Sequence, residues 1–135
     1  MQRARQTCAL AGFGAEMVTE PLLSEWDYGE YEGLTTPEIH AASPGWDLFR
    51  DGCPGGETPG AVARRADLLL DRLRADAALC GREVMLFSHG HFSRLLLTCW
   101  VGLEVAKARH FELHAGGFGR LAWENGWPAV EVWNC

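Results

Sequence analysis

Apolar side chains recur every three or four positions within 58–81, and this spacing predicts a long amphipathic helix. The apolar stripe, which we expect to face a core, consists of Val62, Ala66, Leu69, Leu73 and Ala77. The polar side chains expected to face water are Arg64, Arg65, Asp71 and Arg74. Thr58 and Pro59 mark the start, because proline at the first helical position gives up an amide that has no partner there anyway. We predict that the helix ends near Cys80 and Gly81.

A short apolar run, VMLFS at 84–88, follows this helix and lies between Gly81 and Gly90. A continuous apolar run of this length is typical of a strand that is buried on both faces. The next run, FSRLLLTCWVG at 92–102, has the length and the closing glycine of a buried helix. Helix, strand and helix in succession predict an α/β sheet.

The other elements that the sequence predicts are short. They are a helix over 1–14, a short strand beginning at Met17 and Val18, surface loops over 20–38 and 51–60, and a second helix starting at Thr36 and Pro37. Two β-rich runs within 118–134 are joined by Glu124-Asn125-Gly126, which is a hairpin signal. We therefore predict an antiparallel strand near the C-terminus.

Composition and charge narrow the classes of protein that fit. The chain has 135 residues, 47% of them hydrophobic, which suits a single domain over 1–135. Its formal charge of −6 repels polyanions, so we expect no nucleic acid partner. No apolar run approaches the roughly 20 residues that cross a bilayer, and no charged-then-apolar leader is visible, so we expect no membrane contact and a cytoplasmic location. Five widely spaced cysteines without a C-x-x-C pair are expected to be reduced and structural.

The stretch LFSHGHFSR at 86–94 holds the strongest chemical signal. His89 directly follows the predicted strand, and ligands in open α/β sheets bind at the carboxyl ends of strands, where helix amides face anions. Ser88 and Gly90 allow a tight turn, so the imidazole and the amides near Gly90 can aim at one phosphoryl oxygen. The alternative is that His89 only caps the helix or satisfies a buried carbonyl.

Four motifs accompany one another in chain order: QRARQT at 2–7, E-x-x-x-G-x-x-E-G at 25–33, PGGE at 54–57 and SHG at 88–90. As a set they cover 2–134 and resemble the histidine phosphatase superfamily, which includes cofactor-dependent phosphoglycerate mutases and small acid phosphatases. EWDYGEYEG together with SHGHFSR is most similar to the small phosphatase branch, with its acid-phosphatase-like and sedoheptulose-bisphosphatase-like proteins.

The resemblance implies a role for each matching residue. Arg3 corresponds to the arginine that clamps the phosphate, whose planar fork suits bidentate contact. Glu25 corresponds to the general acid, which protonates the leaving oxygen and later activates water. His89 corresponds to the second, non-nucleophilic histidine of the pocket, and Gly90 lies beside it at the phosphate. We expect Arg3, Glu25, His89 and Gly90 to form the site.

Several other residues in or near these motifs can be interpreted in two ways. The acidic residues expected to be solvated are Asp27, Glu30 and Glu32, and the aromatic residues that either line the pocket or pack in the core are Trp26, Tyr28, Tyr31 and Trp46. Glu57 either fixes the loop or contacts the substrate. Arg94 either contacts the substrate or pairs with a carboxylate on its helix, and His91 has no role that a motif assigns.

The resemblance also implies a three-layer α/β/α fold around an open, mostly parallel sheet, with an antiparallel C-terminal strand. The family's nucleophile is a histidine in an Arg-His-Gly motif at the end of the first strand, and this sequence has no Arg-His-Gly. We therefore expect 1–135 to be an incomplete domain that lacks the first strand or strands. A fragment or a misassigned start is favoured over a degenerate paralogue, because Arg3, Glu25 and His89 are retained. An incomplete sheet leaves backbone groups unpaired, so the isolated chain is expected to be poorly stable or to form homo-oligomers.

The expected activity is hydrolysis of a small phosphorylated metabolite through a phosphohistidine in the complete protein, without a cofactor or metal, and the chain alone is expected to be inactive or impaired. Phosphatase is favoured over mutase, because the family's mutases usually carry a long insertion where a short segment joins Gly33 to PGGE here. A non-catalytic module that binds phosphorylated ligands is the main alternative. A zinc hydrolase is less favoured: the histidines that suggest it are His89, His91, His110 and His114, and they have no complete ligand set.

Overall fold

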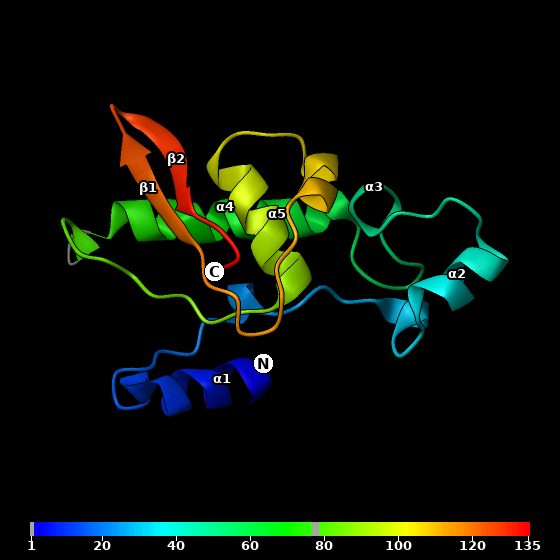
Figure 1. Ribbon diagram of the computed structural model, residues 1–135, viewed down its shortest axis with the longest axis horizontal. Helices are drawn as coiled ribbons and strands as arrows, with labels where there is room; N and C mark the ends of the chain where they lie inside the picture. The colour runs from blue at the N-terminus through cyan, green and yellow to red at the C-terminus, as the bar shows by residue number, and fades with distance from the viewer. Residues whose placement is uncertain (1, 77–78) are drawn as a thin grey trace.

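The computed structural model describes residues 2–76 and 79–135 and arranges short helices around two longer ones (Figure 1). Of the short helices, η1 is a π-helix and the other η elements are 3-10 helices. In chain order the elements are α1 (Gln2–Cys8), η1 (Ala9–Phe13), η2 (Pro21–Leu23), η3 (Gly29–Tyr31), α2 (Thr36–Ala42), α3 (Leu48–Asp51), α4 (Pro59–Ala75), α5 (Gly90–Trp100), η5 (Val105–His110), β1 (Arg120–Glu124) and β2 (Trp127–Val132).

The core lies where α4 and α5 pack against each other. Val62 and Ala66 of α4 and Phe92 and Leu95 of α5 have no exposed surface. Burial of a large apolar side chain contributes roughly 1.5–3 kcal/mol, so this contact is a main source of stability for the chain. The prediction that 92–102 forms a buried helix is confirmed.

Helix α4 begins as its sequence predicts, with the Thr58 hydroxyl accepting a hydrogen bond from the amide of Ala61 at 3.2 Å. It ends at Ala75, short of the predicted end near Cys80, because the backbone of Asp76 is extended. The predicted stripe position Ala77 lies outside the described residues.

The prediction that Arg65 faces water is wrong, since its side chain is only 15% exposed. Val62 and Leu69, which are both buried, lie three and four residues away from Arg65. Residues with this spacing share one face of a helix, so Arg65 is carried inward with the apolar stripe. A guanidinium that is turned inward needs hydrogen-bond partners, and these are the carboxylate of Glu57 and backbone carbonyl oxygens within 22–25.

The predicted C-terminal hairpin is confirmed, with β1 and β2 pairing antiparallel and Glu124 opposite Trp127. Asn125 and Gly126 form the turn with φ values of 50° and 83°. Two successive residues with positive φ match the right-handed twist of a hairpin, and asparagine followed by glycine adopts them at low cost.

The two strands predicted at Met17–Val18 and 84–88 are absent, and within 2–76 and 79–135 the sheet consists of β1 and β2 alone. Val84 and Met85, which were expected to be buried, are 43% and 51% exposed. A strand needs a neighbour to accept and donate its backbone hydrogen bonds, and no described segment pairs with this one. In Figure 1 the chain over 82–89 runs as coil between α1 on one side and the α4–α5 pair on the other.

Candidate active site

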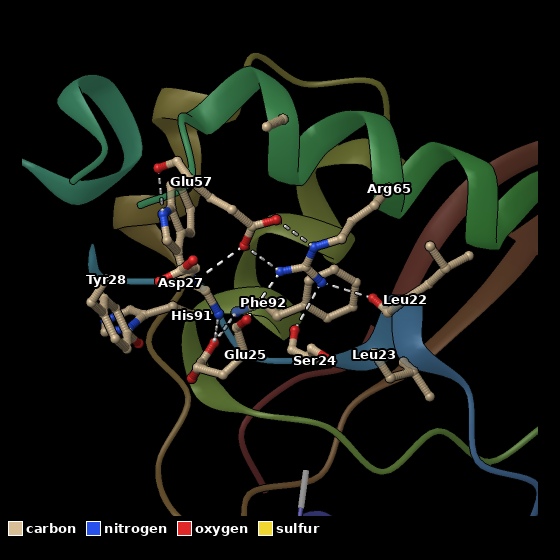
Figure 2. A network of polar contacts seen from close by, with 12 residues as sticks. Leu22, Leu23, Ser24, Glu25, Asp27, Tyr28, Glu57, Arg65, His91 and Phe92 are labelled. Carbon is tan, nitrogen blue, oxygen red and sulfur yellow. Dashed lines mark hydrogen bonds and ion pairs between the residues drawn. The ribbon is translucent and has the colours of Figure 1, made fainter. Parts of the chain in front are cut away.

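Glu25 is held against the first turn of α5. Its Oε1 atom accepts hydrogen bonds from the backbone amides of Trp26 and Phe92, both at 3.0 Å (Figure 2). The amide of Phe92 belongs to the first turn of α5, where backbone N–H groups have no partner within the helix and the helix dipole favours a negative charge. The carboxylate of Glu25 is therefore held at the N-terminus of α5, a helix that begins directly after His89.

Arg65 holds the backbone on both sides of Glu25. Its guanidinium donates to the carbonyl oxygens of Leu22 and Ser24, each at 2.8 Å, and to that of Glu25 at 3.1 Å. Its remaining N–H groups donate to the two carboxylate oxygens of Glu57 at 2.9 and 2.8 Å, so all five donors of the guanidinium are used. Figure 2 shows this fork joining the long helix α4 to the Glu25 loop.

Glu57 completes the same network, and of its two interpretations the loop-fixing one is confirmed. One of its carboxylate oxygens accepts from the amide of Asp27 at 3.0 Å, and its carbonyl oxygen accepts from the indole nitrogen of Trp26 at 2.9 Å. The hydrogen bond from Arg65 lowers the pKa of Glu57, with further contributions from the Asp27 amide and the charge of Arg65. The PGGE segment therefore acts as a brace for the loop that carries Glu25.

Tyr28 connects Glu25 with His91, a residue for which the sequence offered no role. The Tyr28 hydroxyl lies 2.6 Å from Nδ1 of His91. Burial, the negative charge of Glu25 and a hydrogen bond to Glu25 raise the pKa of Tyr28, while burial lowers the pKa of His91. At neutral pH the phenol is therefore protonated and the imidazole is neutral.

His89 stands at the N-cap of α5, but its side chain makes no capping hydrogen bond. Among the buried polar side-chain atoms of the described residues, its Nε2 atom is the one without a hydrogen-bond partner. Burial lowers the pKa of His89, the charge of Glu25 opposes this, and the charge of Arg3 lowers it further. Because an unpartnered buried nitrogen costs about 1–3 kcal/mol, a ligand oxygen at this position would remove that cost.

The four site residues expected from the sequence are placed as follows. Gly90 is the first residue of α5, directly after His89, and Glu25 is bonded to the same helical turn. The Ser88 hydroxyl donates to the carbonyl oxygen of Leu23 at 2.7 Å and so ties the His89 segment to the Glu25 loop. Arg3 is exposed on α1, and its charge and that of Glu25 both act on His89. That Arg3, Glu25 and His89 surround one bound phosphate stays a prediction.

The aromatic residues divide between core and cleft. Trp26 is buried in the core, at 2% exposure. Tyr28, Tyr31 and Trp46 line a cleft of about 440 Å³ that also contains His91. Tyr28 lines this cleft and also feels the negative charge of Glu25, which together with burial raises the pKa of Tyr28.

Arg94 does not pair with a carboxylate on its helix, which was one of its two interpretations. Its guanidinium donates to the carbonyl oxygens of Ala108 and Arg109 at 3.2 and 3.0 Å and lies over the ring of Phe49. The zinc hypothesis also finds no support in the described residues, where no group of three or more histidine, cysteine or acidic side chains is arranged to hold a metal ion. No described helix is both long and apolar enough to cross a membrane.

Sequence reasoning assigned no site role to Arg65 or His91 and left Tyr28 with two interpretations. The one signal for Arg65 in the sequence was its spacing from Glu57, which lies eight residues earlier and just before the start of α4. At this spacing, an arginine in the second turn of the helix can form an ion pair with a glutamate in the preceding loop. Tyr28 is three residues after Glu25, and His91 is two residues after His89, so both lay inside the recognised motifs. Their mutual contact spans 63 positions and had no signal in the sequence.

The sequence profile of the histidine phosphatase superfamily, branch 1, matches residues 1–135. The chain belongs to the histidine phosphatase superfamily. It is 42% identical over 125 residues to an acid phosphatase of Mycobacterium tuberculosis, a match that covers 93% of this chain and 60% of the relative. It is 36% identical over 104 residues to a sedoheptulose 1,7-bisphosphatase of Saccharomyces cerevisiae, covering 67% of this chain and 38% of that enzyme.

A solved structure of an open reading frame product from Mycobacterium tuberculosis superposes on this histidine phosphatase chain with a TM-score of 0.89 at 38% identity. The superposition covers 98% of this chain and 67% of the other. The described helices and hairpin therefore have the arrangement of a phosphoglycerate-mutase-like histidine phosphatase, and the chain spans about 60% of the length of the acid phosphatase it matches.

Proposed function

We propose that this chain supplies the general acid and one side of the phosphate pocket of a phosphomonoester hydrolase that acts on a small phosphorylated metabolite. The observation that carries the proposal is the fixed position of Glu25 at the N-terminus of α5, beside His89, whose buried Nε2 atom has no hydrogen-bond partner among the described residues. The similarity to an acid phosphatase and to a sugar bisphosphatase supports the choice of a hydrolase. The short segment between Gly33 and PGGE favours hydrolysis over mutase chemistry.

The proposed reaction has two steps in the complete protein. A nucleophilic histidine of an Arg-His-Gly motif attacks phosphorus, the bond from phosphorus to the leaving oxygen breaks, and Glu25 gives its proton to that oxygen. Water then attacks phosphorus, the bond from phosphorus to the histidine nitrogen breaks, Glu25 takes a proton from the water, and inorganic phosphate leaves. His89, the amide near Gly90 and Arg3 bind the phosphoryl oxygens and stabilise the charge that develops on them. No cofactor or metal takes part in these steps.

The sequence has no Arg-His-Gly, so we assign the nucleophile to a strand that these 135 residues do not contain. That strand would pair with the coil at 82–89 and complete a three-layer fold with a mostly parallel sheet. The exposure of Val84 and Met85 supports this position, because both are apolar and lie in a run that is typical of a buried strand. We further propose a cytoplasmic location, where the five free cysteines would stay reduced.

The test uses the chain extended at its N-terminus by a strand that ends in Arg-His-Gly, with para-nitrophenyl phosphate as substrate and a chelator present. We expect turnover, and we expect His89→Ala to lower kcat by about 100-fold or more, with the free energy of unfolding little changed. His114→Ala, an exposed histidine outside the site, is the matched control. Full turnover in the His89→Ala protein would remove His89 from the mechanism, and turnover that depends on added zinc would favour a metal hydrolase.

The second candidate is a module that binds phosphorylated ligands without hydrolysing them, which the lack of an Arg-His-Gly motif in the sequence favours. Calorimetric titration of the 135-residue chain with inorganic phosphate, combined with the turnover assay, distinguishes the hydrolase from the binding module. Phosphate binding that needs His89, together with no turnover in the extended protein, would favour the binding module.

A further inference from the structure

Tyr28 and His91 form a hydrogen-bonded pair near Glu25 that the proposed reaction does not use. The Tyr28 hydroxyl lies 2.6 Å from Nδ1 of His91, which is a short hydrogen bond. The imidazole packs edge-on against the rings of Tyr28 and Phe49, with ring centroids 5.8 and 5.7 Å away. Because aromatic neighbours lie on both sides, the imidazole is held with Nδ1 aimed at the hydroxyl.

The hydrogen bond of this pair has one direction at neutral pH. Burial lowers the pKa of His91, the charge of Glu25 opposes this and the charge of Arg94 adds to it. Burial, followed by the negative charge of Glu25, raises the pKa of Tyr28. The phenol therefore keeps its proton and donates it to a neutral ring, so Nδ1 of His91 accepts and the ring proton lies on Nε2.

Glu25 is held one residue away from this pair along α5. Its Oε1 atom accepts from the amide of Phe92, the residue after His91, and also from the amide of Trp26. An oxygen that already accepts two hydrogen bonds is a poor place for a proton, so Oε2 is the oxygen that carries the proton of the acid. The charge of Glu25 acts on both Tyr28 and His91, and Figure 2 shows the three side chains at the same end of the network.

Other titratable groups also face these three side chains. They are Glu32, Cys53, His89 and Arg94, while Asp47 and Arg109 in the same cleft pair with each other at 3.5 Å. Burial raises the pKa of Cys53 to about 11, and burial lowers the pKa of His89. Both are therefore uncharged near neutral pH, so neither adds a charge that changes together with that of Glu25 there.

We propose that Tyr28 and His91 are positioning residues that control how readily Glu25 gives up its proton, because the Tyr28 hydroxyl alternates between two acceptors. While Glu25 is protonated, the hydroxyl donates to Nδ1 of His91. After Glu25 has given its proton to the leaving oxygen, the hydroxyl donates to the new carboxylate and stabilises its charge. The inference rests on the proposed function, because it takes Glu25 to be the general acid.

The first test measures the pH dependence of kcat/KM for para-nitrophenyl phosphate in the N-terminally extended protein. On the alkaline side, kcat/KM falls as Glu25 loses the proton that it gives to the leaving oxygen. Tyr28→Phe removes the donor to the carboxylate, so this fall should move to higher pH by about 0.5–1 unit. Tyr31→Phe is the matched control: its hydroxyl lies 3.4 Å from that of Ser43, and its removal should not move the profile.

The substitutions at His91 should act in the opposite direction. His91→Leu removes the competing acceptor, so the Tyr28 hydroxyl donates to the carboxylate alone and the alkaline fall should move to lower pH by about 0.5–1 unit. His91→Asn places a side-chain oxygen near the position of Nδ1 and should restore the wild-type profile. A purely structural role would lower kcat/KM equally at every pH. Shifts of the same sign in Tyr28→Phe and His91→Leu would overturn the inference.

A second measurement needs no turnover. Nitrogen-15 NMR of the 135-residue chain reports which ring nitrogen of His91 carries the proton, and we expect Nε2 in the wild type and a mixture in Tyr28→Phe. A wild-type ring protonated on Nδ1 would overturn the inference. If the extended protein turns over and no variant moves the profile, the proposed function stands and this inference is wrong. If the extended protein does not turn over at all, the proposed function fails and the inference fails with it.

Discussion

The two sides of the α5 N-terminus differ in how completely their polar groups are satisfied. On the Glu25 side, all five donors of Arg65 are used, and Glu57 and the amides around Glu25 form one connected network. On the other side, His89 has a buried nitrogen without a partner, and the apolar side chains of Leu10 and Val18 are 90% and 86% exposed. The chain thus fixes the Glu25 carboxylate in place, whereas the His89 side is left open to a ligand or to further protein.

On the Glu25 side, the carboxylate of Glu25 can be replaced without disturbing the network formed by Arg65 and Glu57. Glu25→Gln keeps a carbonyl oxygen that can accept from the amides of Trp26 and Phe92, but it has no proton to give. In the extended protein we expect kcat to fall by about 10²–10⁴-fold, with the midpoint of thermal unfolding nearly unchanged. Glu30→Gln, an exposed acid in the same loop, should retain turnover. If Glu25→Gln kept full kcat, the general acid would have to be another residue.

Removing the brace itself should cost stability. Arg65→Met leaves the Glu57 carboxylate without its ion pair and three carbonyl oxygens without donors, so we expect a loss of about 3 kcal/mol in the free energy of unfolding. Urea denaturation measures it, with Arg64→Met as the control on the exposed face of the same helix. Equal stability of the two variants would mean that water replaces the fork at no cost.

The sequence predicts features that depend on neighbouring residues better than features that depend on residues far away along the chain. Helix starts at Thr58 and Thr36 and the turn at Asn125-Gly126 depend on a few neighbouring residues, and they were predicted correctly. The strand at 84–88 depends on a partner strand that no described residue provides, so its apolar pattern indicated a burial that this chain does not reach.

The candidate site shows the same division. Glu25, His89 and Gly90 were chosen as candidates because they lie in short motifs, and the structure brings Glu25 to the helix that His89 and Gly90 begin. Arg65 was assigned to water because helical spacing cannot tell a charged residue at the edge of an apolar stripe from one that turns toward a loop 40 positions away.

Lowering the pH should reduce the contribution of the Arg65–Glu57 ion pair to the free energy of unfolding. The pKa of Glu57 is below its ordinary value of 4.5 in the folded chain, so the unfolded chain binds more protons between the two values. The contribution of the ion pair to stability is therefore complete above about pH 4.5 and is lost as pH falls through the folded pKa. Because the pair is partly exposed, we expect this change to be below about 1 kcal/mol.

The pH effect is measured as the difference between the wild-type chain and Glu57→Gln in urea unfolding from pH 7 to pH 3. The variant has no carboxylate to protonate, so the gap between the two proteins should narrow as the pH falls. A gap that stayed constant, or that widened in acid, would contradict the assignment of the lowered pKa to the Arg65–Glu57 pair.

On the His89 side, substitution of an exposed apolar residue should change the free energy of unfolding little in this chain and more in a longer one. Leu10→Ala removes a side chain that is 90% exposed, so we expect a change within about 0.5 kcal/mol in the free energy of unfolding. Leu95→Ala, the same substitution at a fully buried position, should cost about 2–5 kcal/mol. If a preceding strand and its helix cover the α1 side, Leu10→Ala should become costlier in the N-terminally extended protein, while the cost of Leu95→Ala stays the same. An unchanged small effect of Leu10→Ala in both proteins would mean that the added segment packs elsewhere, because burying a leucine necessarily makes its truncation destabilising.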